Sequence, residues 1–354
     1  MSDQPDHPAD DSGASKRVTM QDVAELAGVG VATVDRVVNQ RAPVRQDTAR
    51  RVLAAAEQLG FRATRVIRNN LETREPPRQL GFLLQKKSTL FYRLLGQALK
   101  EACSRYPHVS AQILFLDELG PRAVTQGISR LTEQCDAIAV VAADHPVVNL
   151  ALEQSPVPVI TLLSELSSPA QAGHVGLDNR SAGRTAAWML TRLSGRPGKV
   201  GIVMGSHRYL CQELCEVSFR SYCRENAADI RLVEAVVSLE DASLAEEATL
   251  ELLTANPDIT GIYCAGGGVS GVIQALRDSG RRDVITVCNE LTDETRDALI
   301  EGWIDCVISH PRPRLAQSAV DLMLELSNQQ TPARSRVILP FELYTAENLW
   351  SEAE

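Results

Sequence analysis

From Gln79 onward, short apolar runs alternate with longer stretches whose apolar residues recur at helical spacing. This alternation predicts repeated strand–helix units, and therefore a parallel sheet with helices on both faces. Because about 275 residues is long for a single sheet, we expect two α/β lobes. The apolar runs are Leu80–Leu84, Ile113–Leu116, Ala137–Val141, Val157–Leu162, Val200–Met204, Ile262–Cys264, Val284–Cys288 and Val307–Ser309.

The composition and the N-terminus limit the classes of protein to which this chain can belong. Aromatic residues make up only 4% of the chain, so the core must consist mostly of aliphatic side chains, as in buried parallel strands. No apolar run approaches the roughly 18 residues that span a bilayer. Residues 1–15 are acidic and polar, which predicts a disordered tail and not a secretory signal. The eight scattered cysteines are expected to be free thiols in a reducing cytoplasm.

The charge is distributed unevenly along the chain. The net charge is −9, yet residues 16–74 carry +5, from eleven Lys and Arg against six Asp and Glu. Residues 1–15 carry −4 and residues 75–354 carry −10. A basic segment is the electrostatic footprint of phosphate binding. We therefore expect DNA to bind the N-terminal module, while the acidic remainder argues against DNA wrapping around the whole protein.

Residues 18–60 read as three short helices, of which the second covers about 31–39. A helical wheel places Val34, Val37 and Val38 on its inner side. Arg36 falls on the outer side, where its guanidinium could read a guanine edge, a contact worth roughly 1–3 kcal/mol of discrimination. Spacing alone does not distinguish this role from the solvated polar face of a small helical bundle.

Residues 18–39 and 51–61 closely resemble the helix-turn-helix of the lactose-repressor (LacI/GalR) family. The resemblance implies a helix-turn-helix domain at 16–61, a hinge or linker at 62–78, and a two-lobed domain for effector binding and dimerisation at 79–354. Gly30 and Asp35 replace the family's usual serines, and Arg45 replaces a capping serine. By this resemblance the base-reading positions are Val31, Ala32 and Arg36, and the phosphate contacts are Thr19, Thr33 and Asn39.

The family's hinge helix inserts a leucine into the minor groove, and the present sequence departs from that pattern. Asn70 stands where the wedging leucine is expected, and Leu71 follows one residue later. Asparagine cannot provide an apolar wedge. Either the register shifts by one residue, or the operator is bent less, or the segment is a plain linker. The candidate hinge contacts are Arg68, Asn70 and Leu71.

The resemblance further implies a domain like the type I periplasmic binding proteins, with two parallel-sheet lobes, three crossovers and a ligand between the lobes. The ligand of an open parallel sheet lies beyond the carboxyl ends of its strands. Several family positions that hold sugar are replaced, including an arginine that corresponds to Cys215, so the ligand is a sugar, a less hydroxylated derivative, or absent. The candidate ligand-binding residues are Phe91, Tyr92, Asp144, His145, Arg208, Cys215, Asn289, Glu290 and His310.

Rival functions have weaker support in the sequence. No nucleophile–base pair or paired carboxylates indicate an enzyme, and Gly266–Gly268 lacks the spacing of a nucleotide loop, so we predict neither catalysis nor a cofactor. His207, Cys211 and Cys215 would form a stripe on a helix, which a metal or redox sensor could use, but no fourth ligand is evident. We therefore predict no metal site. A sugar-transport component is disfavoured by the basic N-terminal module.

The sequence thus predicts an α/β protein with an all-α N-terminal domain. Its expected function is that of a cytoplasmic transcription regulator that associates with the nucleoid by binding DNA. We expect a homodimeric repressor that reads a near-palindromic operator and responds to a carbohydrate-like effector, with no membrane partner. The alternative is a thiol-responsive or ligand-independent regulator with a degenerate sugar pocket.

Overall fold

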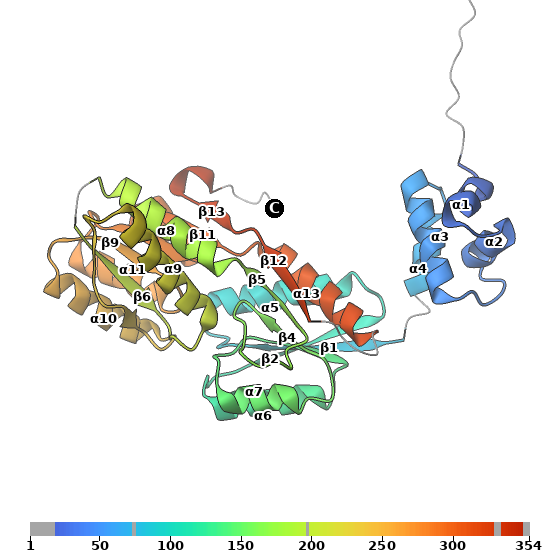
Figure 1. Ribbon diagram of the computed structural model, residues 1–354, viewed down its shortest axis with the longest axis horizontal. Helices are drawn as coiled ribbons and strands as arrows, with labels where there is room; N and C mark the ends of the chain where they lie inside the picture. The colour runs from blue at the N-terminus through green and yellow to red at the C-terminus, as the bar shows by residue number, and fades with distance from the viewer. Residues whose placement is uncertain (1–17, 73–75, 196–197, 329–333, 350–354) are drawn as a thin grey trace, which may run out of the picture. The chain divides into compact units, whose positions relative to one another are not determined.

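The chain forms two compact units, which divide between Pro77 and Arg78 apart from the short segment Tyr106–His108 that groups with the first. A computed structural model describes residues 18–72, 76–195, 198–328 and 334–349 (Figure 1). The tail predicted at 1–15 lies outside these residues. We call the first unit the head and the second the body.

The head is a four-helix unit. Thr19 begins the first helix through a capping box with Asp22, and Gly28 ends it with a left-handed φ of 63°. The three predicted helices are present, and a fourth follows them within the segment predicted as hinge or linker. The helices are α1 Met20–Ala27, α2 Val31–Asn39, α3 Gln46–Leu59 and α4 Thr64–Glu72.

The first lobe of the body is a six-stranded sheet in the order β12-β5-β4-β3-β1-β2, with every neighbouring pair parallel. Helices α5 and α13 pack together and cover one face, while α6 and α7 cover the other (Figure 1). Its strands are β1 Arg78–Leu84, β2 Val109–Phe115, β3 Ala137–Val140, β4 Val159–Leu162, β5 Gly173–Leu177 and β12 Ser335–Leu339. Its helices are α5 Leu90–Ser104, α6 Pro121–Thr132, α7 Pro146–Glu153 and α13 Arg312–Ser327.

The second lobe is a sheet in the order β13-β11-β10-β9-β6-β7, with β8 also beside β6. Among the described strands of this sheet, only β13 runs antiparallel to its neighbour. Its strands are β6 Lys199–Met204, β7 Arg231–Leu232, β8 Val236–Val237, β9 Ile259–Cys264, β10 Ile285–Asn289, β11 Cys306–Ser309 and β13 Glu342–Tyr344. Its helices are α8 Asn179–Leu193, α9 Leu210–Asn226, α10 Ala242–Ala255, α11 Val269–Ser279, α12 Asp293–Glu301 and the 3-10 turn Ala346–Asn348.

The two-lobed parallel architecture confirms the fold predicted from the sequence. Each predicted apolar run coincides with part of a strand, and the chain crosses between lobes three times, after β5, after β11 and after β12. The prediction missed β5, whose Gly173, His174 and Gly176 interrupt the apolar pattern, and the short or edge strands β7, β8, β12 and β13. None of the described helices is long and apolar enough to cross a membrane.

Candidate DNA-reading surface and ligand cavity

Helix α2 presents one apolar face to the head core and one polar face outward. Val34, Val37 and Val38 are buried, whereas Val31 is 40% exposed and Arg36 is exposed. The Arg36 guanidinium makes no hydrogen bond or ion pair with any other described residue. It is therefore available for an external acceptor, as base reading requires.

Two other residues predicted to contact DNA, Asn39 and Thr19, already form hydrogen bonds within the head. The Asn39 amide donates a 2.7 Å hydrogen bond to Asp35, and Arg41 lies 3.4 Å from the same carboxylate. The charge of Asp35 is thus offset by the neighbouring Arg41. The Thr19 hydroxyl is part of the capping box of α1. Ala32 is exposed and Thr33 is half-buried. Their contacts with DNA remain predictions.

Helix α4 packs into the head, so residues 64–72 do not form a free linker. Ile67 is fully buried in the core that α1, α2 and α3 form, and Leu71 packs against the same cluster. The Asn70 side-chain amide donates to the carbonyl oxygens of Val37 and Val38, at 3.3 and 2.8 Å. The three predicted hinge contacts are therefore occupied within the head, since Arg68 pairs with Glu57 on α3.

A large cavity of the body lies between the lobes, at the carboxyl ends of strands from both sheets. Its volume is about 460 Å³. Of the predicted ligand-binding residues, the cavity is lined by Phe91, Tyr92, Cys215, Asn289, Glu290 and His310. Polar side chains beyond those nine candidates also line the cavity, namely Lys86, Ser164, Asn179, Tyr209, Gln212, Glu240 and Ser243.

Glu290 and His310 form a pair at the ends of the adjacent strands β10 and β11. Nδ1 of His310 lies 2.5 Å from one carboxylate oxygen of Glu290, and the His310 backbone N–H donates to the other at 3.3 Å. Glu290 has a left-handed φ of 74°. Nε2 of His310 is buried and has no hydrogen-bond partner among the described residues. Because His310 lines the cavity, this nitrogen is a free polar group for a ligand.

Family models match both units of the chain. Residues 19–64 match the bacterial regulatory proteins of the lacI family, and residues 80–331 match a periplasmic binding protein domain. The chain belongs to the lacI family of bacterial regulators. The resemblance stated from the sequence is thereby confirmed.

Relatives of this lacI-family regulator match along most of their length. It is 25% identical to catabolite control protein A of Priestia megaterium, and the match covers 92% of this chain and 97% of the relative. It is 26% identical to the HTH-type transcriptional regulator GalR of Escherichia coli (strain K12), over 91% and 93% of the two chains. These relatives and the family match identify a transcriptional regulator.

The fold of the body is that of solute-binding proteins. An ABC transporter solute binding protein from Agrobacterium vitis, solved with bound α-D-tagatopyranose, superposes with a TM-score of 0.70. The two proteins are 19% identical, and the match covers 77% of this chain and 95% of that chain. At this identity the likeness establishes the fold alone.

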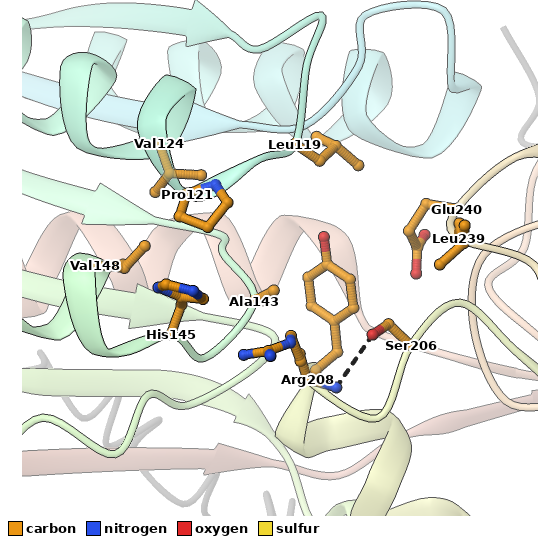
Figure 2. A pocket seen from close by; sticks show the side chains of 11 residues that line it. Leu119, Pro121, Val124, Ala143, His145, Val148, Ser206, Arg208, Leu239 and Glu240 are labelled. Carbon is orange, nitrogen blue, oxygen red and sulfur yellow. Dashed lines mark hydrogen bonds between the residues drawn. The ribbon is translucent and has the colours of Figure 1, made fainter.

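Three predicted ligand residues of the regulator lie outside the large cavity. Arg208 and His145 line a smaller neighbouring pocket of about 340 Å³ (Figure 2). Asp144 contacts Arg208 across the cleft, because its backbone N–H donates to the Arg208 carbonyl oxygen at 2.7 Å. Burial raises the pKa of Asp144, but hydrogen bonds from Ser167 and Asn149 and the charge of Arg208 bring it below the ordinary value. These residues thus join the two lobes.

The stripe of His207, Cys211 and Cys215 that was predicted for one helix does not form, because α9 begins only at Leu210. His207 lies in the turn before α9, where its Nδ1 is 3.4 Å from Glu216. Burial raises the pKa of Cys211 and of Cys215 to about 12. Cys215 Sγ donates to the Asn179 carbonyl oxygen. No group of three or more potential ligands able to hold a metal is found within the described ranges.

Proposed function

We propose that the regulator is a homodimeric repressor whose affinity for a near-palindromic operator is switched by a small molecule bound between the lobes. The exposed Arg36 on α2, which pairs with no other described residue, carries the DNA-reading part of this proposal. Two copies of a helix-turn-helix read two half-sites related by the dimer symmetry. Because such a protein acts on chromosomal DNA, we place it in the cytoplasm.

The cavity between the lobes supports the ligand part of the proposal. It lies where open parallel sheets bind ligands, and it contains a buried imidazole nitrogen that has no hydrogen-bond partner in the part of the chain that the structure describes. A ligand shifts the equilibrium between two states only by the difference in its affinity for them. A molecule that contacts residues of both lobes meets this condition when the lobes close on it.

The DNA-reading proposal is tested by Arg36→Ala. The operator is first obtained by selecting bound sequences from randomised duplexes with the full-length protein. Arg36→Ala is expected to weaken binding to the selected operator by roughly 1–3 kcal/mol in fluorescence anisotropy, while binding to unrelated duplex changes little. Arg62→Ala, which removes the same charge from an exposed position of the head, should affect both duplexes alike. Equal losses for Arg36→Ala on both duplexes would refute base reading.

A further inference from the structure

The turn Ser238–Asp241 at the cavity wall holds two residues in an unusual backbone conformation. Leu239 and Glu240 have φ values of 52° and 58°, in the left-handed region that glycine or asparagine usually occupies. The turn is fixed to both neighbouring strand ends. The Ser238 backbone N–H donates to the carbonyl oxygen of Met204, the last residue of β6, and its hydroxyl donates to the Gly267 carbonyl oxygen after β9.

This strained turn presents the carboxylate of Glu240 to the cavity in a defined position. A Cβ atom at Gly205 would lie 1.7 Å from one carboxylate oxygen, and a Cβ at Gly267 would lie 2.0 Å from the other. A side chain at either position would therefore displace the carboxylate from the position that it occupies here. The glycine-rich segment after β9, which lacks the spacing of a nucleotide loop, therefore has a steric role in building this wall.

Gln212 orients the Glu240 carboxylate further. Its side-chain oxygen accepts hydrogen bonds from the backbone N–H groups of Gly205 and Ser206, at 2.7 and 3.2 Å. These two bonds fix which end of the amide is the donor. Its nitrogen then donates to Glu240 at 2.7 Å. The carboxylate is thus held by a neutral donor, and no described cation lies within ion-pair distance of it.

The charges around the cavity are unbalanced. Lys86 is the one lysine or arginine among the described lining residues, and it forms no ion pair there, whereas four carboxylates line the same space. Glu290 is paired with His310, but Glu240 has no such partner within the described ranges. Burial raises the pKa of Glu240 above its ordinary value, although Gln212 and Lys86 lower it. The four carboxylates belong to Glu240, Asp241, Glu290 and Glu294.

Aromatic rings line the same part of the cavity. Phe91 and Tyr92 meet edge to face at 5.2 Å, and both line the space with Tyr209. Burial raises the pKa of Tyr92, and the charges of Glu240 and Glu290, which line the same cavity, are among those that raise it further. Aromatic faces combined with a desolvated carboxylate are the chemistry that recognises a positively charged nitrogen.

We propose that the cavity binds an amino sugar, with its ammonium group against the Glu240 carboxylate and the ring of Tyr92. The hydroxyl groups of the ligand are received by the amide and hydroxyl side chains of Asn179, Ser164 and Ser243. This inference rests on the proposed ligand switch and names its chemical class. A sugar phosphate or sugar acid would bring a second negative charge beside unpaired carboxylates and is excluded by the same charges.

The experiment compares matched ligands on the full-length protein by isothermal titration calorimetry and thermal shift. The probes are D-glucosamine, D-galactosamine and D-mannosamine, each beside its neutral parent sugar and its N-acetyl derivative, with D-gluconate as the acid. At least one amine is expected to bind more tightly than its neutral parent sugar. The N-acetyl derivatives and the acid are expected to bind most weakly. A ranking with the neutral sugars equal or first would overturn the inference.

The variant Glu240→Gln removes the charge and keeps the size of the side chain. It is expected to weaken amine binding by about tenfold or more and to leave binding of the neutral parent unchanged. Glu247→Gln, at an exposed position on α10, is the matched control and should bind as the natural protein does. Because the wild-type ranking needs no variant, the inference stays testable if Glu240→Gln fails to fold.

The outcomes separate this inference from the proposed function. If a neutral sugar binds and changes operator affinity while no amine binds better, the switch stands and the amino-sugar inference falls. If amines bind but Glu240→Gln retains their affinity, the assignment of the ammonium to Glu240 falls. If no probe changes either stability or operator affinity, the inference fails and the ligand part of the proposed function loses its support.

Discussion

The head and the body build their candidate sites in opposite ways. In the head, the residues predicted to read bases stand on one nine-residue helix, and that helix packs by its own periodicity. In the body, the cavity collects residues from Lys86 to His310, brought together by the ends of strands in two sheets. A local pattern therefore suffices for the first site, whereas the second depends on topology and on short loops. The predictions below test where this contrast holds.

The largest effect is expected for Ile67→Ala, which tests whether α4 belongs to the head. Removing a fully buried side chain from the head core should destabilise the head by about 2–5 kcal/mol. Hydrogen exchange of the full-length protein should show the loss across residues 18–72. Val66→Ala is the control, because Val66 is 48% exposed on the same helix. Equal protection in the two variants would mean that α4 is not part of the folded head.

The next effect concerns the body and is a loss of stability in acid through His174. Its Nδ1 lies 2.9 Å from the Thr161 hydroxyl, and burial lowers its pKa to about 4 from an ordinary value of 6.5. Of the charges that face it, Glu165 raises this pKa, whereas Arg336 and His310 lower it. The folded state binds the proton more weakly than the unfolded state, so stability falls between about pH 6.5 and 4.

The size of this loss is up to about 3 kcal/mol. Urea unfolding at pH 7 and at pH 4.5 measures it. His174→Gln cannot titrate, so its stability should change less between the two pH values than that of the natural protein. If His174→Gln loses as much stability as the natural protein between pH 7 and pH 4.5, other groups cause the effect.

A smaller effect is expected for Asn70→Ala, which tests the contact between α4 and the end of α2. The variant removes the hydrogen bonds to the carbonyl oxygens of Val37 and Val38, with an expected cost of about 0.5–1.5 kcal/mol. Hydrogen exchange at the end of α2 should rise. Arg65→Ala, at an exposed position on α4, should leave that exchange unchanged. No difference between the variants would show that Asn70 does not fix this end.

The smallest effect is expected from oxidation, which tests the rival thiol-sensing function of the cavity wall. With pKa values of about 12, Cys211 and Cys215 hold almost no thiolate at neutral pH and react slowly with peroxide. Operator binding after mild peroxide treatment should therefore match that of the untreated protein. A reversible loss of binding that Cys211→Ser and Cys215→Ser abolish would instead favour thiol sensing.

The sequence was sufficient where a physical rule acts locally. The period of α2 placed Arg36 outward, and the apolar runs located the strands whose carboxyl ends form the cavity. The rule that ligands lie beyond those ends selected Asn289, Glu290 and His310, which do line the space. Their roles toward a ligand remain predictions.

What the sequence missed depended on long-range pairing. Glu240 follows β8, which has only two residues and so gives no apolar run for the same rule to use. Asp144 and Arg208 follow strands as the rule requires, but they contact each other across the lobes and lie outside the large cavity. Asn70 was read as a position for a wedge, because nothing local in the sequence shows that the end of α2 would lie within reach of its amide.

Because the natural cysteines are poorly accessible, dyes on introduced cysteines can follow the closure of the two lobes. All eight are free thiols, seven of them buried and Cys211 half-buried. Maleimide dyes react with exposed thiolates, so the natural chain should take up little label at neutral pH. A single cysteine introduced at an exposed position of each lobe would then carry the dyes by itself. Energy transfer between the two dyes could report lobe closure in a chain that keeps all of its own cysteines.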